Sequence, residues 1–144
     1  MSKLTTEELL KILRNTHSVS DLNTYTSSLS GQKLYHSFSE YMNEYIRSKH
    51  LIESELILAS QIQRTYAYQI LNGNKNPGRD KVLSLCLAAC MTYEETQRAL
   101  TLADVGKLYA KRKRDSILIF ALDHQLSVQQ TNELLFEENE EILS

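Results

Sequence analysis

The residues of this 144-residue chain that could do chemistry are basic side chains gathered in two stretches. The first stretch, QIQRTYAYQILNGNKNPGRDK at residues 61–81, holds four basic residues and one acid: Arg64, Lys75, Arg79, Lys81 and Asp80. Lys and Arg neutralise phosphate groups, so a stretch of this kind could attract a nucleic acid. The alternative interpretation is a solvated charged surface that has no partner.

The second basic stretch, GKLYAKRKRD at residues 106–115, is richer in charge. It holds five basic residues and one acid: Lys107, Lys111, Arg112, Lys113, Arg114 and Asp115. The net charge of the chain is −2, and five Glu lie in its last twelve residues. Attraction to nucleic acid would therefore have to come from one face and not from the whole molecule.

Residues suited to catalysis or metal binding are scattered. The four His residues fall in separate elements: His17, His36, His50 and His124. The sequence has no nucleophile-elbow, zinc-protease or phosphate-loop motif. Cys86 and Cys90 lie in an apolar run without the further ligands that a zinc site needs, so they are predicted to be core thiols. We expect no enzyme, no metal site and no cofactor.

The composition predicts an all-α protein. Hydrophobic residues make up 42% of the chain, which has only one Pro and four Gly, so the turn residues that separate many short strands are missing. A chain of this length can bury a core as one domain. No run of 18 apolar residues and no leader-like N-terminus is present, which predicts a cytoplasmic protein without membrane contact.

The N-terminal region contains one clear helix signal. Thr5 and Glu8 form a potential capping box for a short helix that ends near Arg14. Residues 15–30 are rich in Ser and Thr, which compete with the backbone for hydrogen bonds and favour turns. This segment is expected to be weakly ordered or to form one short helix, and it could be phosphorylated.

Helical periodicity becomes stronger from Ser37 onward. Apolar residues fall on one stripe of a helix that is expected to end near Lys49: Phe38, Tyr41, Met42, Tyr45 and Ile46. ESELILAS and RTYAYQIL predict two shorter helices, of which the second ends at Asn72-Gly73. A loop around Pro77 follows, and the nearly all-apolar helix after it is expected to be the central and most buried one.

The C-terminal half contains an internal repeat. With an offset of 35 residues, RDKVLSLCLAACMTYEETQRALTLA aligns with RDSILIFALDHQLSVQQTNELLFEE. Identical positions are Arg79 and Arg114, Asp80 and Asp115, Leu83 and Leu118, Leu87 and Leu122, Thr96 and Thr131, and Leu100 and Leu135. Each copy also has a capping box, at Thr92–Glu95 and at Ser127–Gln130. The repeat predicts two helical hairpins that pack on one core.

The stretch LIESELILASQIQRTYAYQILNGNKNPGRDKVLSLCLAACMTYEETQRAL resembles the Cro/repressor class of helix-turn-helix proteins, the XRE-like family. It matches that family's order of helix, turn, recognition helix, Asn-Gly stop, proline-bearing loop and two further helices. The resemblance implies a five-helix repressor-like domain at residues 37–103. An N-terminal helix and the Ser/Thr-rich segment at residues 1–36 would precede it. A basic linker and helical hairpin at residues 104–144, similar to the extension of a bacterial subgroup, would follow.

The resemblance also implies roles for individual residues. It puts Arg64, Thr65 and Gln69 at base-facing positions of the recognition helix, with Tyr68 near the same face. Arg can bind guanine and Gln can bind adenine through two hydrogen bonds each, while Thr can contact a thymine methyl group. Lys75, Arg79 and Lys81 would contact the phosphate backbone. A transcription regulator that binds double-stranded DNA in the major groove as a homodimer is therefore expected.

Four positions depart from the family pattern. The turn position usually held by Gly is Gln61, which is expected to strain or reshape the turn. Gln63 and Ile52 stand where small polar caps are usual, and Glu53 would repel phosphate. These departures leave an alternative from another class, a protein-interaction adaptor built on the same helices. Its partner could be a kinase or a component of a mobile-element system. Phosphorylation of residues 15–30 would add negative charge near a DNA-facing surface and should weaken DNA binding.

Overall fold

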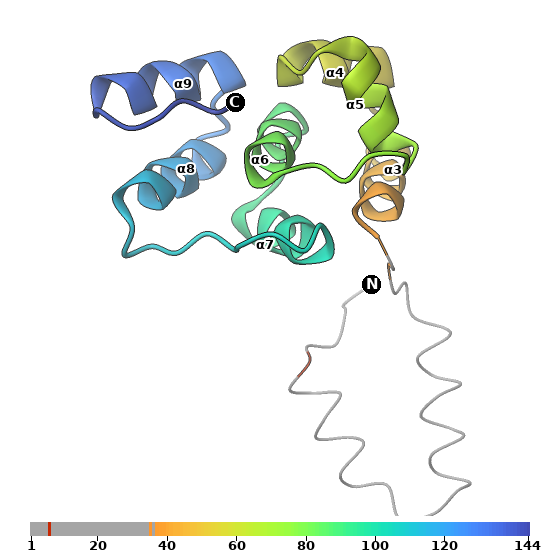
Figure 1. Cartoon of the computed structure of the whole chain (residues 1–144), viewed down its shortest axis with the longest axis horizontal. Helices are drawn as coiled ribbons and strands as arrows, with labels where there is room; N and C mark the ends of the chain where they lie inside the picture. Colours follow the sequence, from red (N-terminus) through yellow and green to blue (C-terminus); the bar gives the residue numbers. More distant parts are fainter. Residues whose placement is uncertain (1–5, 7–34, 36) are drawn as a thin grey trace, which may run out of the picture. The chain divides into compact units, whose positions relative to one another are not determined.

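The computed structural model describes residues 6, 35 and 37–144, and His36–Ser144 form a compact unit by themselves (Figure 1). Within the described residues the chain is all α-helical, as the composition predicted, and has no strand. The helices are α3 Phe38–Ser48, α4 Glu53–Ser60, α5 Arg64–Leu71, α6 Arg79–Ala88, α7 Tyr93–Leu102, α8 Lys113–Asp123 and α9 Val128–Glu137. The predicted helix at residues 5–14 and the Ser/Thr-rich segment at 15–30 lie outside the described residues.

Helix α3 confirms the stripe predicted from Ser37 onward. The Ser37 hydroxyl accepts the Glu40 amide at 3.2 Å and caps the N-terminus, and the helix ends one residue before Lys49. The buried residues are Phe38, Tyr41, Met42 and Ile46. The fifth stripe residue, Tyr45, is half-buried and donates a hydrogen bond to the Ala89 carbonyl at 3.3 Å. Burial raises the Tyr45 pKa to about 12, which keeps this hydroxyl protonated as a donor.

Helix α6 is the central helix, as its nearly continuous apolar sequence predicted. It packs on α4, α7 and α9, and Figure 1 shows it between α4 and α5 on one side and α8 and α9 on the other. Six consecutive residues from Val82 to Leu87 are buried. Cys86 is among them, and burial raises the pKa of its thiol to about 12. A helix without a solvent-facing stripe must be covered on all sides, which explains its position.

The prediction of two core thiols is wrong for Cys90, whose side chain is exposed. The helix ends before it, with Ala89 as the C-cap, and Cys90 adopts a left-handed φ of 56°. The Cys90 amide donates to the Leu87 carbonyl at 3.1 Å, while the Met91 amide donates to the Cys86 carbonyl at 3.0 Å. This Schellman termination turns the chain away from the helix axis and points Cys90 to solvent.

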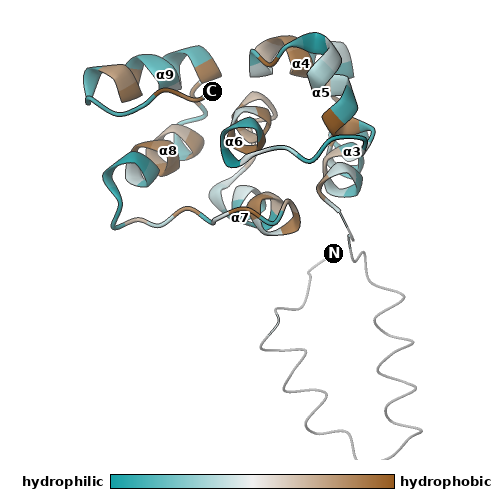
Figure 2. Ribbon diagram, in the orientation of Figure 1, coloured by the Kyte–Doolittle hydropathy of each residue, from teal (hydrophilic) through white to brown (hydrophobic). Residues whose placement is uncertain are grey.

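The two hairpins predicted from the internal repeat are confirmed as α6–α7 and α8–α9. Both predicted capping boxes are formed, by Thr92 with Glu95 and by Ser127 with Gln130. The left-handed residues after the helices repeat with the same offset of 35 positions: Cys90 with Gln125, and Asp104 with Asn139. Figure 2 shows apolar residues on both α8 and α9 as well as on the helices of the first hairpin.

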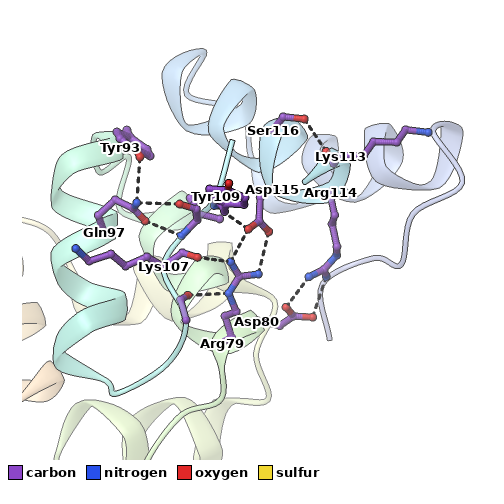
Figure 3. Close-up of polar contacts among 12 residues, drawn as sticks. Arg79, Asp80, Tyr93, Gln97, Lys107, Tyr109, Lys113, Arg114, Asp115 and Ser116 are labelled. Atoms are coloured by element: carbon purple, nitrogen blue, oxygen red, sulfur yellow. Dashed lines mark hydrogen bonds and ion pairs between the residues drawn. The ribbon is translucent and has the colours of Figure 1, made fainter. Parts of the chain in front are cut away.

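Two ion pairs join the hairpins, and each links an Arg of one repeat to an Asp of the other (Figure 3). Arg79 of the first repeat binds Asp115 of the second through two hydrogen bonds of 3.0 and 2.8 Å. Arg114 of the second repeat binds Asp80 of the first, at 3.1 and 3.0 Å. Bidentate pairs of this kind fix both distance and orientation, so the N-termini of α6 and α8 are held side by side.

Candidate nucleic-acid interface

Helices α4 and α5 are connected by a three-residue turn, Gln61 to Gln63, that is tightly held. The buried Ser60 hydroxyl donates to the Ile57 carbonyl at 2.6 Å and accepts the Ile62 amide at 3.2 Å. Ile62 is itself buried and anchors the middle of the turn in the core. These contacts set the angle at which α5 leaves the turn and presents its outer face.

Gln61 strains the turn, which is one of the two outcomes expected from the sequence, and does not reshape it. It has φ 60° and ψ 16°, the left-handed conformation that Gly usually supplies, and its amide donates to the Leu58 carbonyl at 3.2 Å. A non-Gly residue in this conformation costs about 1–2 kcal/mol from the Cβ contact with the following carbonyl. The turn therefore keeps its geometry at a cost in stability, because the core contacts of Ser60 and Ile62 hold both ends of Gln61.

Gln61→Gly is therefore expected to raise the free energy of unfolding by about 0.5–1 kcal/mol, because Gly adopts positive φ without the Cβ contact. Gln63→Gly is the matched control. Gln63 has φ −54°, so Gly there gains nothing and loses the side-chain cap. Urea unfolding of both variants checks this. A Gln61→Gly protein that is less stable than the parent would contradict a left-handed residue at this position.

Gln63 caps α5 although it is longer than the usual capping residues. Its side-chain oxygen accepts the Tyr66 amide at 2.8 Å, as Ser or Asn would. Ile52, at the corresponding position before α4, makes no side-chain cap. Of the four departures from the family pattern, Gln61 and Gln63 thus leave the local geometry intact, whereas Ile52 leaves the α4 amides without a side-chain partner.

The four residues predicted to face bases lie together on one face of α5. Arg64 and Thr65 are exposed, and Tyr68 and Gln69 are half-buried. Residues three and four positions apart share a helix face, so this face is opposite the buried Ala67 and Ile70. The Arg64 guanidinium lies 5.7 Å from the centre of the Tyr68 ring, within the range of a cation–π contact. The structure thus brings a cation, a hydroxyl and an amide to one outer surface.

The loop after α5 presents Lys75 to solvent. Asn74 and Lys75 both donate their amides to the Gln69 carbonyl, at 2.9 and 3.1 Å, so the loop folds back on the end of the helix. Gly73 has φ 86°, which only Gly adopts without strain, and Pro77 is buried. Lys75 therefore projects from an ordered loop directly after the α5 face.

The other two residues predicted to contact phosphate, Arg79 and Lys81, are less exposed than Lys75. Lys81 is half-buried in the first turn of α6. Arg79 uses its guanidinium within the fold: besides Asp115, it donates to the Gly106 and Lys107 carbonyls at 2.8 and 2.9 Å. Four of its five N–H donors are thereby engaged. The structure thus gives Arg79 a structural role that its place in a basic stretch did not suggest.

Part of the second basic stretch is also engaged in internal contacts. Arg114 pairs with Asp80, and Lys113 donates to the Glu138 carbonyl at 2.7 Å. Lys107, Lys111 and Arg112 are exposed. The repeated Arg-Asp dipeptide was the available sequence signal for these ion pairs, since identical charged residues at the fixed offset pointed to equivalent positions in the two hairpins.

The charge around α5 is not uniformly favourable to a polyanion. Helix α5 contains no acid, but α4 has Glu53 and Glu55 in its first turn. Carboxylates there stabilise α4 through the helix dipole, and they also add negative charge beside the candidate interface. Among the described residues no group of three His, Cys, Asp or Glu could hold a metal ion.

Comparison with known proteins gives no match to a family model, to a curated protein or to a solved structure. Within the described part of the chain, every helix is too short or too polar to cross a membrane.

Proposed function

We propose that this chain is a sequence-specific DNA-binding transcription regulator with a repressor-like helix-turn-helix fold, and that α5 reads the major groove. The observation that supports this most directly is the outer face of α5, where Arg64, Thr65, Tyr68 and Gln69 lie together after a left-handed turn. The major groove is about 12 Å wide and admits one helix. A regulator of this class would act in the cytoplasm, would need no cofactor and would have no enzymatic activity.

Each residue of this face has a role in the proposal. Arg64 donates two hydrogen bonds to a guanine, and the Tyr68 ring below it limits the orientations of the guanidinium before DNA arrives. Gln69 binds an adenine edge, and Thr65 contacts a thymine methyl group or a phosphate. Orienting a long side chain in the free protein reduces the entropy lost on binding.

Phosphate contacts in this proposal come from Lys75, within the loop after α5, and from Lys81, in the first turn of α6. Lys75 is the stronger candidate, because it is exposed on an ordered loop. Arg79 is assigned to the interior contacts with Asp115 and the linker, since its donors are already engaged there. Phosphate contacts position the protein without specifying sequence.

Selection of random duplex DNA by the full chain at about 0.1–0.15 M salt tests the proposal. An enriched motif is expected, and Arg64→Ala should lose about 1–3 kcal/mol of preference at one base position. Lys75→Ala should instead weaken binding to all sequences and reduce the log–log salt slope by about 1. Arg98→Ala, which removes an exposed cation from α7, is the matched control and should leave the base preference and the salt slope unchanged.

Absence of enrichment would favour the second candidate function, a protein-interaction adaptor. A specific observation supports this candidate: Leu58 on α4 is 81% exposed and Ile52 before it is 58% exposed, beside the two first-turn carboxylates. In this candidate function, a partner protein would bury these two apolar side chains. Control by phosphorylation of residues 15–30 would require modified protein in the native cell, and mass spectrometry that finds this segment unmodified under all growth conditions would exclude it.

A further inference from the structure

The linker between α7 and α8 is held to the fold through its backbone. Arg79 of α6 donates to the carbonyls of residues 106 and 107, at 2.8 and 2.9 Å. The Gln97 side chain of α7 bonds both backbone groups of Leu108, at 2.8 and 3.0 Å, and the Leu108 side chain is buried. The Tyr109 amide donates to Asp115 of α8 at 2.9 Å. Three helices therefore fix the course of this linker (Figure 3).

The segment 139–144, which follows the second hairpin, is the counterpart of this linker in the internal repeat. Its backbone is held in the same way, 35 residues later: Arg114 Nε to Glu141 O (3.0 Å), Leu143 N to Asn132 (2.8 Å) and Ser144 N to Asp80 (3.2 Å). This counterpart contains Glu140 and Glu141 and has no Lys or Arg. The contacts that hold the linker therefore do not require its basic side chains.

Three basic side chains of the linker are directed to solvent. Lys107, Lys111 and Arg112 are exposed, and none of them makes a hydrogen bond or an ion pair through its side chain within the described residues. Tyr109, which lies between them in the sequence, is 53% exposed. The four residues are called the linker surface below. It presents three cations within six residues on a fixed backbone, and the fold does not neutralise them.

The linker begins beside the loop that carries Lys75. Loop residues 75–77 line the same cavity as Asp104 and Val105 of the linker. Arg79, at the start of α6, follows this loop directly and holds the linker at residues 106 and 107. Figure 1 shows the linker continuing from there to α8, away from α5. Asp104 is an exposed acid in this region, so the linker surface adds a net positive charge only from Lys107 onward.

We propose that the linker surface binds phosphate groups of duplex DNA outside the base pairs that α5 reads. This inference rests on the proposed function, because α5 in the major groove places Lys75, and with it the start of the linker, beside a DNA strand. Duplex DNA carries one negative charge per about 1.7 Å of its length, so the cations of a fixed segment meet phosphates whatever the sequence. The Tyr109 hydroxyl adds a donor for a phosphate oxygen. Flanking DNA of any sequence thus contributes to the affinity.

The salt dependence of binding to a random duplex of about 30 base pairs, three helical turns, tests this inference with the full chain. Fluorescence anisotropy gives the dissociation constant at each salt concentration. The double variant Lys111→Gln, Arg112→Gln removes two charges and keeps long polar side chains, so the log–log salt slope should fall by about 2. The matched control is Lys49→Gln, Arg98→Gln, which removes two exposed cations from outside the linker and should leave the slope unchanged.

A second variant, Lys107→Gln, separates a charge effect from a change at the start of α8, where Arg112 is the N-cap. Its backbone contact with Arg79 is kept, and the salt slope should fall by about 1.

Two results would overturn the inference. One is a salt slope that the linker variants leave unchanged or lower no more than the control does. The other is binding to a single-stranded RNA of the same length that these variants weaken more than duplex binding, since the surface would then serve a different partner. Failure of the proposed function gives a separate result, namely no enriched motif and no effect of Arg64→Ala, whatever the linker variants do to the slope. An enriched motif with an unchanged slope would contradict only the role of the linker surface.

Discussion

Asp115→Ala is expected to lower the free energy of unfolding by about 3 kcal/mol, as breaking a buried ion pair does when one charge is left without its partner. The Asp115 side chain is 4% exposed and accepts two hydrogen bonds from Arg79 and one from the Tyr109 amide. Its loss would leave the Arg79 guanidinium without its anion and would release the linker that this guanidinium holds through two carbonyls. Urea unfolding followed by circular dichroism gives the difference.

Asp80→Ala is the matched control for this effect, because it removes the equivalent carboxylate of the other repeat. Asp80 is 22% exposed on its side chain, as is its partner Arg114, so water replaces part of the lost interaction. The free energy of unfolding is expected to fall by about 1 kcal/mol, which is close to the contribution of surface ion pairs. Equal losses for the two variants would contradict the conclusion that burial makes the Arg79–Asp115 pair the stronger one.

The dependence on pH follows from the Asp115 pKa. Burial alone would raise that pKa, but the hydrogen bonds from Arg79 and from the Tyr109 amide outweigh burial and hold it below its ordinary value. A carboxyl with a lowered pKa in the folded state contributes stability that is fully present above its unfolded pKa of about 3.9 and is lost as pH falls through the folded value. The difference between the parent and Asp115→Ala should therefore be constant near neutral pH and should shrink below about pH 4.

Leu85→Ala is expected to lower the free energy of unfolding by about 3 kcal/mol, because it removes a fully buried side chain from the central helix and leaves a cavity. The equivalent substitution in the second repeat, Phe120→Ala, removes a larger side chain that is 48% exposed. It should cost the isolated chain less than about 1 kcal/mol, since the surrounding water fills the space. Urea unfolding at low protein concentration compares the two.

This pair of variants also tests whether Phe120 is exposed while its counterpart Leu85 is buried. Comparable losses for the two variants would mean that Phe120 is covered within the single chain and would contradict its exposure.

Local patterns predicted the helices and their ends well. The stripe from Phe38 to Ile46 and the two capping boxes depend only on residues within one or two turns of each other, so the chain itself carries the information. The Asn72-Gly73 stop was predicted for the same reason, and α5 ends at Leu71 with Gly73 in a positive-φ conformation. The placement of Arg64, Thr65, Tyr68 and Gln69 on one face also follows from helical spacing alone.

The structural roles of Arg79 and Cys90 were not predicted from the sequence, and that of Gln61 was predicted only in part. Arg79 was predicted to be a surface cation that contacts phosphate, but its hydrogen-bond partners lie 27 to 36 positions away, on the linker and on α8. Cys90 was predicted to lie in an apolar helix, but the Schellman termination turns it outward. Gln61 was expected to strain or reshape the turn, and the buried Ser60 and Ile62 hold it in a strained left-handed conformation that does not reshape the turn.

Local sequence patterns are sufficient to predict that the described chain is helical, where most of its helices begin and end, and that its two C-terminal hairpins are repeats, because propensity, capping and periodicity act over a few residues. The packing of distant segments determines which charged side chains are engaged within the fold and which remain exposed. The same packing buries Leu85 of the first repeat and leaves its counterpart in the second repeat, Phe120, 48% exposed. Burial and ion pairing depend on contacts between segments, and identical residues acquire different roles when different neighbours cover them.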